Sequence, residues 1–220
     1  MPQVFYKVQF PWNYTNSSND SVYNQNYYTT RAEANLTAYY ELNSKYSFLS
    51  GLRYLTDHAE LYKTNSDLVF NYNGSKKINY YNFAGYAQAN LKLKIFTLVP
   101  GFRFEKHNVY GAVLVPRINL TKKIGNWNID LQYNEAFRAP SVLNIDLNPS
   151  IKPEKTKDKE IEVSYRVAQK QIVALTLFQI DIINPIIYQS YGSIETYEND
   201  IRTGTMGLET EYKFKSEKQN

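Results

Sequence analysis

The sequence predicts an all-β chain, an antiparallel up-and-down transmembrane β-barrel to which these 220 residues contribute about ten strands. Three observations predict this fold. Apolar and polar residues alternate along many segments, which is the side-chain period of a β-strand. Short and long connections alternate between the segments, as in a barrel with one plain rim and one functional rim. Aromatic residues gather near both ends of the strands, where a lipid-embedded barrel carries its girdles.

The expected strands follow one another along the whole chain. They are residues 4–10, 31–42, 46–56, 81–93, 96–104, 114–120, 127–137, 161–167, 172–181 and 205–214. Short turns are expected near residues 43, 94, 123 and 169. Long polar loops are expected through Asn13, Asn16, Asn19 and Asn24, and at residues 57–79, 138–160 and 189–199. On the long-loop side, only the connection at residues 107–108 is brief, so we assign the short turns to one rim and the loops to the other.

Each strand is expected to turn its apolar residues toward lipid and its polar residues toward the lumen. The strand at residues 127–134 shows this best, because Trp127, Ile129, Leu131 and Tyr133 alternate with polar residues. The residues expected to face inward carry charges of both signs, which favours cross-strand ion pairs along the lumen. They are Arg31, Glu33, Glu41, Arg53, Arg103, Glu105, Arg117, Glu160, Glu162, Arg166, Glu209 and Glu211.

Two features fit this scheme less well. Pro100 and Pro116 lie inside expected strands, where proline removes a ladder donor, and we expect a β-bulge at each. Residues 172–183 are apolar on both faces until Gln179 and Asp181, so the pattern does not decide which face of this strand meets lipid.

Composition narrows the class of protein. The chain has no cysteine, which excludes thiolate-ligated metal sites, and its net charge of +4 is spread out and not gathered into a basic stripe, which argues against nucleic acid as a partner. The mean hydropathy of -0.53 does not argue against a barrel, because barrel strands hide their apolar positions one residue in two. Its 21 tyrosines suit a boundary between lipid and water. We expect no cofactor and no catalytic or metal-binding residue.

Two motifs carry a resemblance to a known family. A strand ends in Phe137, Arg138, Ala139 and Pro140, and the next strand is preceded by Asn148, Lys152, Pro153 and Glu154. This pairing resembles the barrel domain of TonB-dependent outer-membrane receptors, where such motifs mark the join between extracellular loops and late strands. We interpret both motifs as architectural and assign no ligand contact to them.

The resemblance implies a larger protein. Such a barrel has about 22 strands, so residues 1–220 would form part of one barrel domain, and the plug domain and last strands would lie outside them. The absence of a secretory signal near the first residue agrees with a fragment. The resemblance further implies the outer membrane of a Gram-negative bacterium, and uptake of a scarce ligand, a ferric siderophore or related chelate. The implied partners are outer-membrane lipid, the plug of the same full-length chain, TonB acting through that plug, and the extracellular chelate.

The long loops contain the residues most suited to ligand binding. Tyrosines stand there among many Asn and Ser residues, and they suit either ligand recognition or anchoring in the lipid headgroups. The candidates are Tyr62, Tyr72, Tyr188, Tyr191 and Tyr197. Lys63, Lys76 and Lys77 could attract an anionic chelate, or they are simply solvated charges.

Two other classes of protein remain open at this point. A complete ten-stranded barrel would be a porin or a protease, the latter with Asp57, His58, Glu105 and His107 at its rim. A complete ten-stranded barrel of either kind requires the first and last strands to pair. A soluble cell-surface binding sandwich would show the same alternation, but it gives no reason for aromatic residues at both strand ends.

Overall fold

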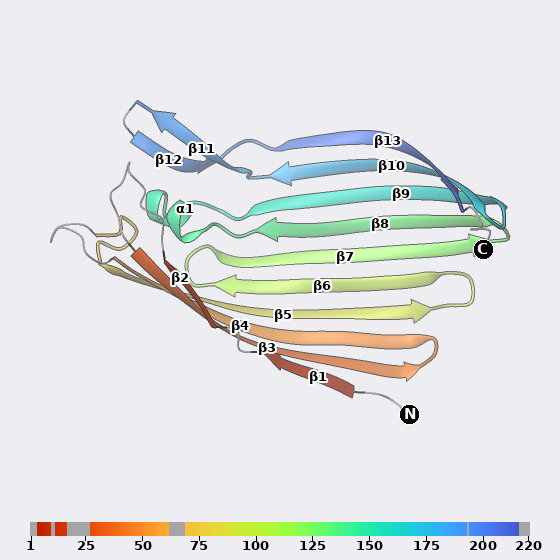
Figure 1. Ribbon diagram of the computed structural model, residues 1–220, viewed down its shortest axis with the longest axis horizontal. Helices are drawn as coiled ribbons and strands as arrows, with labels where there is room; N and C mark the ends of the chain where they lie inside the picture. The colour runs from red at the N-terminus through yellow and green to blue at the C-terminus, as the bar shows by residue number, and fades with distance from the viewer. Residues whose placement is uncertain (1–3, 10–11, 17–26, 62–68, 193, 216–220) are drawn as a thin grey trace, which may run out of the picture.

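The computed structural model describes residues 4–9, 12–16, 27–61, 69–192 and 194–215, and most of them lie in antiparallel strands (Figure 1). The strands of the first half are β1 (Val4–Gln9), β2 (Trp12–Asn16), β3 (Tyr27–Asn43), β4 (Tyr46–Leu61), β5 (Lys77–Lys92), β6 (Thr97–His107) and β7 (Gly111–Ile124). Those of the second half are β8 (Trp127–Arg138), β9 (Glu154–Ala168), β10 (Gln171–Ile183), β11 (Ile186–Tyr191), β12 (Ile194–Asn199) and β13 (Thr203–Phe214). One helix, α1 (Val142–Leu147), precedes β9.

The main antiparallel sheet has the order β1, β3 to β10, and β13, with β2 paired to β3, and β11 and β12 form a separate two-stranded sheet. β1 pairs with residues 35–40 of β3, and β2 pairs with residues 28–32 of the same strand. The two short strands therefore occupy one strand position beside β3, and the sheet has the expected ten strand positions. The all-β, up-and-down fold is therefore confirmed. β1 and β13 lie at opposite edges of the open sheet (Figure 1), and no closed barrel is seen in the described residues, so the arrangement does not support a complete ten-stranded barrel.

The short turns lie where the alternation places them, but several long loops are shorter than expected. β2 occupies residues 12–16 of the first expected loop, and β4 and β5 extend to Leu61 and Lys77. The expected loop at residues 189–199 is instead largely a hairpin of β11 and β12. These predictions were wrong because polar residues dominate these segments, so their few apolar residues, such as Leu61 and Ile78, gave too short a pattern to predict a strand. Pairing with a neighbouring strand satisfies their backbone groups.

The two strand prolines interrupt the ladder without a bulge, so the bulges expected from the sequence are wrong. Beside Pro100, the pairing of β5 with β6 skips from Gln88–Gly101 to Leu91–Leu98 in unchanged register. Beside Pro116, the pairing of β7 with β8 stops at Arg117–Asn134, also in unchanged register. A proline lacks only one N–H group, and the ladder gives up local pairs without inserting a residue.

The register decides which face of β10 meets lipid. Val173, Leu175 and Leu177 stand directly opposite Tyr165, Val163 and Ile161 of β9, and directly opposed residues share a face of the sheet. The other face of β10 carries Ala174, Thr176 and Phe178 next to lumen residues of β9. The apolar residues of the lipid face are exposed; Leu131, Ile161, Leu177 and Leu208 are among them.

The aromatic residues of the outward face lie near both ends of the strands. Trp127 and Tyr165 pack together near the short turns with ring centroids 4.6 Å apart, and Tyr54, Tyr81 and Phe83 are exposed near the long loops. In the described part of the chain, no helix is long and apolar enough to cross a membrane.

A glycine on the lumen face has a specific packing role. A Cβ atom at Gly51 would lie 2.3 Å from the Tyr86 ring, which covers this glycine from β5. The Tyr86 and Thr37 hydroxyls share a hydrogen bond of 2.7 Å across the strand between them. Gly51→Ala is expected to displace the ring and to cost about 1–3 kcal/mol of unfolding free energy in the full-length protein, measured by denaturant unfolding.

The matched control is Gly85→Ala. A Cβ at Gly85 would meet its nearest atom at 3.5 Å, an ordinary contact. Equal losses of stability for the two variants would contradict the role given to the Tyr86 ring.

Candidate functional site

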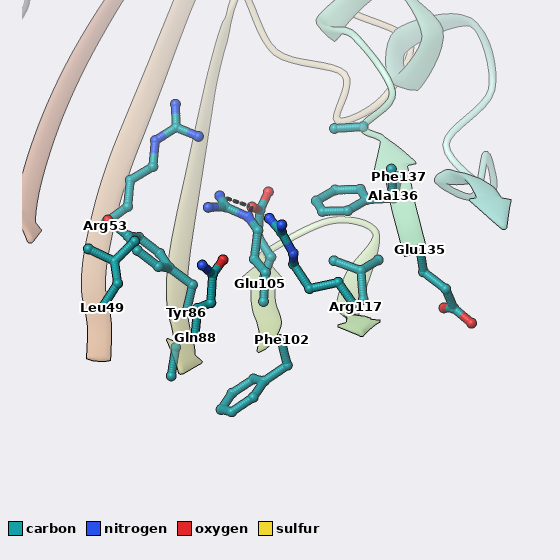
Figure 2. A pocket seen from close by; sticks show the side chains of 14 residues that line it. Leu49, Arg53, Tyr86, Gln88, Phe102, Glu105, Arg117, Glu135, Ala136 and Phe137 are labelled. Atoms are coloured by element: carbon teal, nitrogen blue, oxygen red, sulfur yellow. Dashed lines mark hydrogen bonds and ion pairs between the residues drawn. The ribbon is translucent and has the colours of Figure 1, made fainter. Parts of the chain in front are cut away.

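The lumen face contains a pocket of about 600 Å³ on β4 to β8, lined by both apolar and charged side chains (Figure 2). The side chains of Arg53, Tyr86, Arg103 and Arg117 line it from consecutive strands, whereas those of Phe102 and Glu135 point away from it in the figure. Arg53 donates to Glu33 over 2.6 Å. Arg117 is exposed and has no ion pair within the described residues, so this part of the wall carries an available positive charge.

Glu105 is the buried anion of this wall. Arg103 Nη2 lies 2.5 Å from one of its carboxylate oxygens, and Asn82 Nδ2 donates to the other over 2.5 Å. The Tyr110 hydroxyl donates to the same oxygen over 3.3 Å. Tyr110 lies in the turn after β6, and burial, followed by the charge of Glu105, raises the pKa of its hydroxyl. The carboxylate is thus satisfied by three donors and fixed in place.

The inward charges do not form the evenly mixed ladder of ion pairs expected from the sequence. Arg31–Asp57, Arg53–Glu33 and Arg103–Glu105 are paired on β3 to β6. On β8 to β13, however, carboxylates stand opposite one another, as Asp130 and Glu162 do, and Glu209 follows two strands away in the row of Glu162. Cross-strand ion pairs are therefore fewer in this half, where Arg138–Glu154 is one of them. Alternation assigns residues to a face but not to neighbours across the sheet. The charges of the lumen wall are therefore unevenly distributed, with paired arginines and acids on β3 to β6 and neighbouring carboxylates on β8 to β13.

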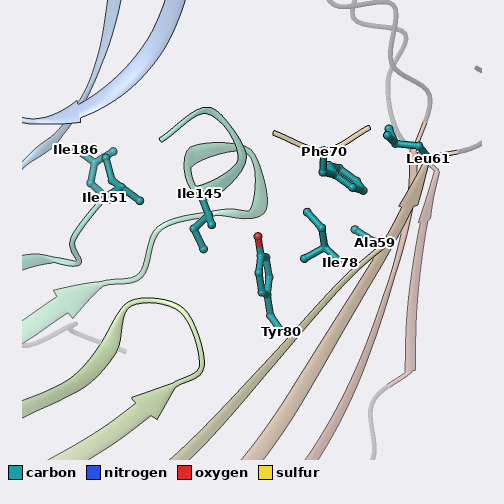
Figure 3. Close-up of a cluster of buried hydrophobic side chains, with 8 residues drawn as sticks. All are labelled: Ala59, Leu61, Phe70, Ile78, Tyr80, Ile145, Ile151 and Ile186. Atoms are coloured by element: carbon teal, nitrogen blue, oxygen red, sulfur yellow. The ribbon is translucent and has the colours of Figure 1, made fainter. Parts of the chain in front are cut away.

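The long-loop rim has an apolar core of its own (Figure 3). Ile145 of α1 and Ile151 of the same loop lie in it, with Ile78 and Tyr80 of β5 and Phe70 of the preceding loop. Ile145 and Ile78 are each only 1% exposed. The loop between β8 and β9 therefore folds over the lumen side of β5 and is not free in solvent.

Helix α1 begins at a capping box. The Asn144 N–H donates to Ser141 Oγ over 3.2 Å, and the Ser141 N–H donates to Asn144 Oδ1 over 2.9 Å. This helix was not predicted from the sequence. The Ser141 and Asn144 spacing after Pro140 was the available signal, but six residues are too few to show helical periodicity.

Asp146 of α1 joins two of the loops. Its buried carboxylate accepts the Tyr72 N–H over 3.1 Å. Burial raises the pKa of this carboxyl above its ordinary value, and the Tyr72 and Asn71 backbone hydrogen bonds only partly oppose that effect. The folded protein therefore binds this proton more readily than the unfolded chain does, and the stability that Asp146 contributes falls as the pH rises above the ordinary carboxyl pKa of 3.8.

We expect Asp146→Asn to keep an acceptor for Tyr72 and to remove this acid-range pH dependence. Asp146→Leu, in contrast, leaves the N–H group unpaired and costs about 1–3 kcal/mol of local stability. Both predictions are checked by hydrogen exchange at residues 70–76 and 142–147 in the full-length protein, measured across the acid range. A pH dependence unchanged in Asp146→Asn would assign it to another group.

The family-motif residues form a connected clamp. Arg138 Nη2 donates to Glu154 Oε2 over 2.8 Å and to the Ile186 carbonyl over 3.1 Å, and the Ile186 N–H donates to the same carboxylate oxygen over 3.1 Å. Asn148 Nδ2 donates to the Tyr197 carbonyl over 2.9 Å, and the Lys152 N–H donates to Asn199 Oδ1 over 2.7 Å.

The remaining motif residues complete this join. Pro140 is buried just before α1, Phe137 lines the lumen pocket, Ala139 is exposed and Pro153 is half-buried. The two motifs thus fasten the loop between β8 and β9 to the β11–β12 hairpin.

The candidate tyrosines divide into two kinds. Tyr72 and Tyr197 pack against the rim core, and Tyr72 meets Tyr80 edge-on with ring centroids 5.8 Å apart. Tyr188 and Tyr191 of β11 are half-exposed or more, and a hydrogen bond to Glu195 raises the pKa of the Tyr188 hydroxyl. Tyr62 and Lys63 lie outside the described residues. Lys77 lies 3.1 Å from Glu60 in an ion pair.

Of the acid and histidine residues considered for a protease, Asp57, Glu105 and His107 share the lumen face, but both carboxylates are paired with arginines. Asp57 is held by Arg31 on the lumen face, and neighbouring His58 points to the other face, where its Nδ1 lies 2.7 Å from Asn79 Oδ1. His107 stacks on Tyr110 with ring centroids 4.1 Å apart. No group of three or more His, Cys, Asp or Glu side chains is placed to hold a metal ion in the described ranges.

Fold and site together define a segment of barrel wall, with one lipid-facing side, one polar lumen side and a rim built from folded loops. The comparison with known families agrees. The family model described as "TonB dependent receptor-like, beta-barrel" matches residues 3–215, and the chain belongs to this family of transport receptors. No curated protein matches the sequence.

Solved structures share the fold at low sequence identity. The siderophore receptor PirA from Pseudomonas aeruginosa has a TM-score of 0.68 and 18% identity over 84% of this chain and 39% of its own. A mutant of the ferric enterobactin receptor PfeA from the same species, with enterobactin bound, has a TM-score of 0.62 and 19% identity over 83% of this chain and 34% of its own. The FrpB iron transporter from Neisseria meningitidis has a TM-score of 0.66 and 15% identity over 88% of this chain and 34% of its own. The chain thus spans little more than a third of these proteins.

Proposed function

We propose that the chain is part of the wall of an outer-membrane active-transport receptor in a Gram-negative bacterium. The receptor takes up a ferric siderophore or a related chelate with energy transmitted by TonB. The observation that carries this proposal is the two-sided sheet, whose apolar face suits lipid and whose opposite face is a charged lumen wall. Membership of the receptor family supports it, as do the siderophore, enterobactin and iron named for the structural neighbours.

The lumen wall suits contact with a plug domain of the same full-length chain. A barrel of about 22 strands encloses a wide channel that needs filling. The exposed Arg117 and the carboxylates around Glu162 and Glu209 offer separate positive and negative surfaces to such a plug. TonB would act through the plug, which lies beyond these residues.

The β11–β12 hairpin offers the contacts that best suit an aromatic or metal-bound ligand. Tyr188 and Tyr191 are exposed on it, while its base is fixed by the motif clamp. Rigid aromatic side chains on a fixed support bind at low entropic cost. Tyr188→Ala combined with Tyr191→Ala is expected to weaken chelate binding about tenfold. Tyr212→Ala, an exposed tyrosine near the short turns, is the matched control and should bind as the parent does.

The test of function is uptake of radioactive iron by cells that express the full-length protein and lack their own siderophore receptors. Ferric catecholate, ferric hydroxamate and haem are supplied separately. Uptake of at least one of them should stop in a strain without TonB, while binding at the cell surface persists. Uptake that continues unchanged without TonB would overturn the proposed energy coupling.

A further inference from the structure

The lipid face carries a groove that crosses five strands. It measures about 920 Å³ and runs over β7, β8, β9, β10 and β13. Two rows of outward side chains border it. The row nearer the long loops is Tyr133, Lys159, Gln179 and Met206, and the row nearer the short turns is Leu131, Ile161, Leu177 and Leu208. Between them, the row from Gln132 to Gly207 turns its side chains toward the lumen, so its backbone forms the floor.

The dimensions of this groove suit an acyl chain. Four spacings between neighbouring strands of roughly 4.8 Å give a length of about 19 Å. One leaflet of a bilayer with a hydrocarbon core of about 30 Å is about 15 Å thick. The row of Leu131, Ile161, Leu177 and Leu208 is entirely apolar.

A basic cluster lies beside the groove, on its long-loop side and on the same face of the sheet. Lys155 and Lys157 lie 3.0 Å and 3.7 Å from Glu135, and Arg202 lies 2.5 Å from Asp181, which stands opposite Lys157 in the ladder. Lys159 is exposed and has no ion pair within 4 Å among the described residues. With Lys159, the cluster holds four cations against two carboxylates, a surplus of two positive charges.

The cluster lies at the depth expected of lipid headgroups. Trp127 marks the aromatic girdle near the short turns, and Glu135 stands eight residues further along β8. At about 3.3 Å per residue and a strand tilt of about 35–45°, this is roughly 20 Å along the membrane normal, a few Å short of the apolar band of about 25 Å on such barrels. Long Lys and Arg side chains extend toward the headgroups over such a distance, so the charged groups of the cluster reach the outer edge of the band, on the long-loop side of the groove.

We infer that this face binds a lipid with an anionic phosphate headgroup in the outward-facing leaflet. Lys157, Lys159 and Arg202 would donate to the phosphate oxygens, and the groove would hold an acyl chain. Charge complementarity selects the headgroup and the apolar row selects the chain. The inference rests on the membrane placement proposed above, but not on the transported ligand.

The test uses the full-length protein in a nonionic detergent that preserves its fold, confirmed by heat-modifiable electrophoretic mobility. Phosphatidylglycerol and phosphatidylcholine with identical long chains are supplied in equal amounts, and retained lipid is measured by native mass spectrometry. The parent protein is expected to retain phosphatidylglycerol at least about fivefold over phosphatidylcholine. The triple variant Lys157→Gln, Lys159→Gln, Arg202→Gln should lose this preference.

The control double variant is Lys77→Gln with Lys106→Gln, which removes outward charges from β5 and β6, away from the groove. It should keep the preference. Ile161→Trp fills the groove without changing charge and should reduce retention of long-chain phosphatidylglycerol. A parent without preference, or a preference equally lost in the control, overturns the inference and leaves the transport proposal standing. Displacement of phosphatidylglycerol by inorganic phosphate alone would show a headgroup site without the acyl groove. Failure of the full-length protein to enter the membrane would overturn both the transport proposal and the lipid site.

Discussion

Residues 1–220 expressed alone are expected not to form a stable membrane barrel, whereas the full-length protein should do so. The sheet is open, with β1 and β2 at one edge and β13 at the other. Each unpaired backbone group at such an edge costs several kcal/mol in hydrocarbon. β13 is 12 residues long, so its free edge alone makes insertion strongly unfavourable.

The measurement is refolding into detergent micelles, followed by electrophoresis with and without heating. The isolated chain should show one mobility, and the full-length protein should show two. A heat-modifiable, protease-resistant barrel from residues 1–220 alone would contradict the open-wall interpretation and restore the complete ten-stranded barrel.

The second large effect is expected at Glu154. One of its carboxylate oxygens accepts from both Arg138 and the Ile186 N–H, and Ile186 belongs to the rim core. Glu154→Ala leaves a guanidinium and a backbone N–H without this partner. Hydrogen bonds to charged groups contribute about 1.5–3 kcal/mol, so amide exchange in the β11–β12 hairpin should accelerate about tenfold to a hundredfold.

The matched control is Glu211→Ala, which breaks the more exposed Lys213–Glu211 pair on β13. It should change local stability by less than about 1 kcal/mol. Arg138→Ala should resemble Glu154→Ala, and the double variant should cost less than the sum of the two single ones. Strictly additive losses would mean that the clamp is not a coupled unit.

The strands of the barrel wall were predicted well from the sequence because the alternation of apolar and polar residues has a simple physical cause. Lipid on one side and water on the other impose a period of two on strands such as residues 127–134. The pattern also located the short turns, because a tight connection must fall where the alternation stops. Where both faces of a segment are apolar, as in residues 172–183, only the register with β9 decided the lipid side.

The rim was harder to predict because its structure depends on contacts between distant segments. Ile145 and Ile151 of the loop between β8 and β9 form one core with Ile186 of β11 and with β5, although these three segments lie far apart in the sequence. The family motif marked Arg138 and Glu154, but it gave no indication that they hold Ile186. The two prolines interrupted or ended the ladder pairing beside them and inserted no residue, an outcome that composition alone cannot distinguish from a bulge.

We expect this sheet to span the outer membrane with its folded loops outside and its short turns inside. Two matched serines test it, because the chain has no cysteine of its own and both sites are exposed. Ser190→Cys lies in the β11–β12 hairpin, and Ser44→Cys lies in the turn between β3 and β4. In a cysteine-free full-length background on intact cells, a membrane-impermeant maleimide should label only Ser190→Cys. Ser44→Cys should react after the outer membrane is permeabilised, and labelling of Ser44→Cys on intact cells would contradict the account.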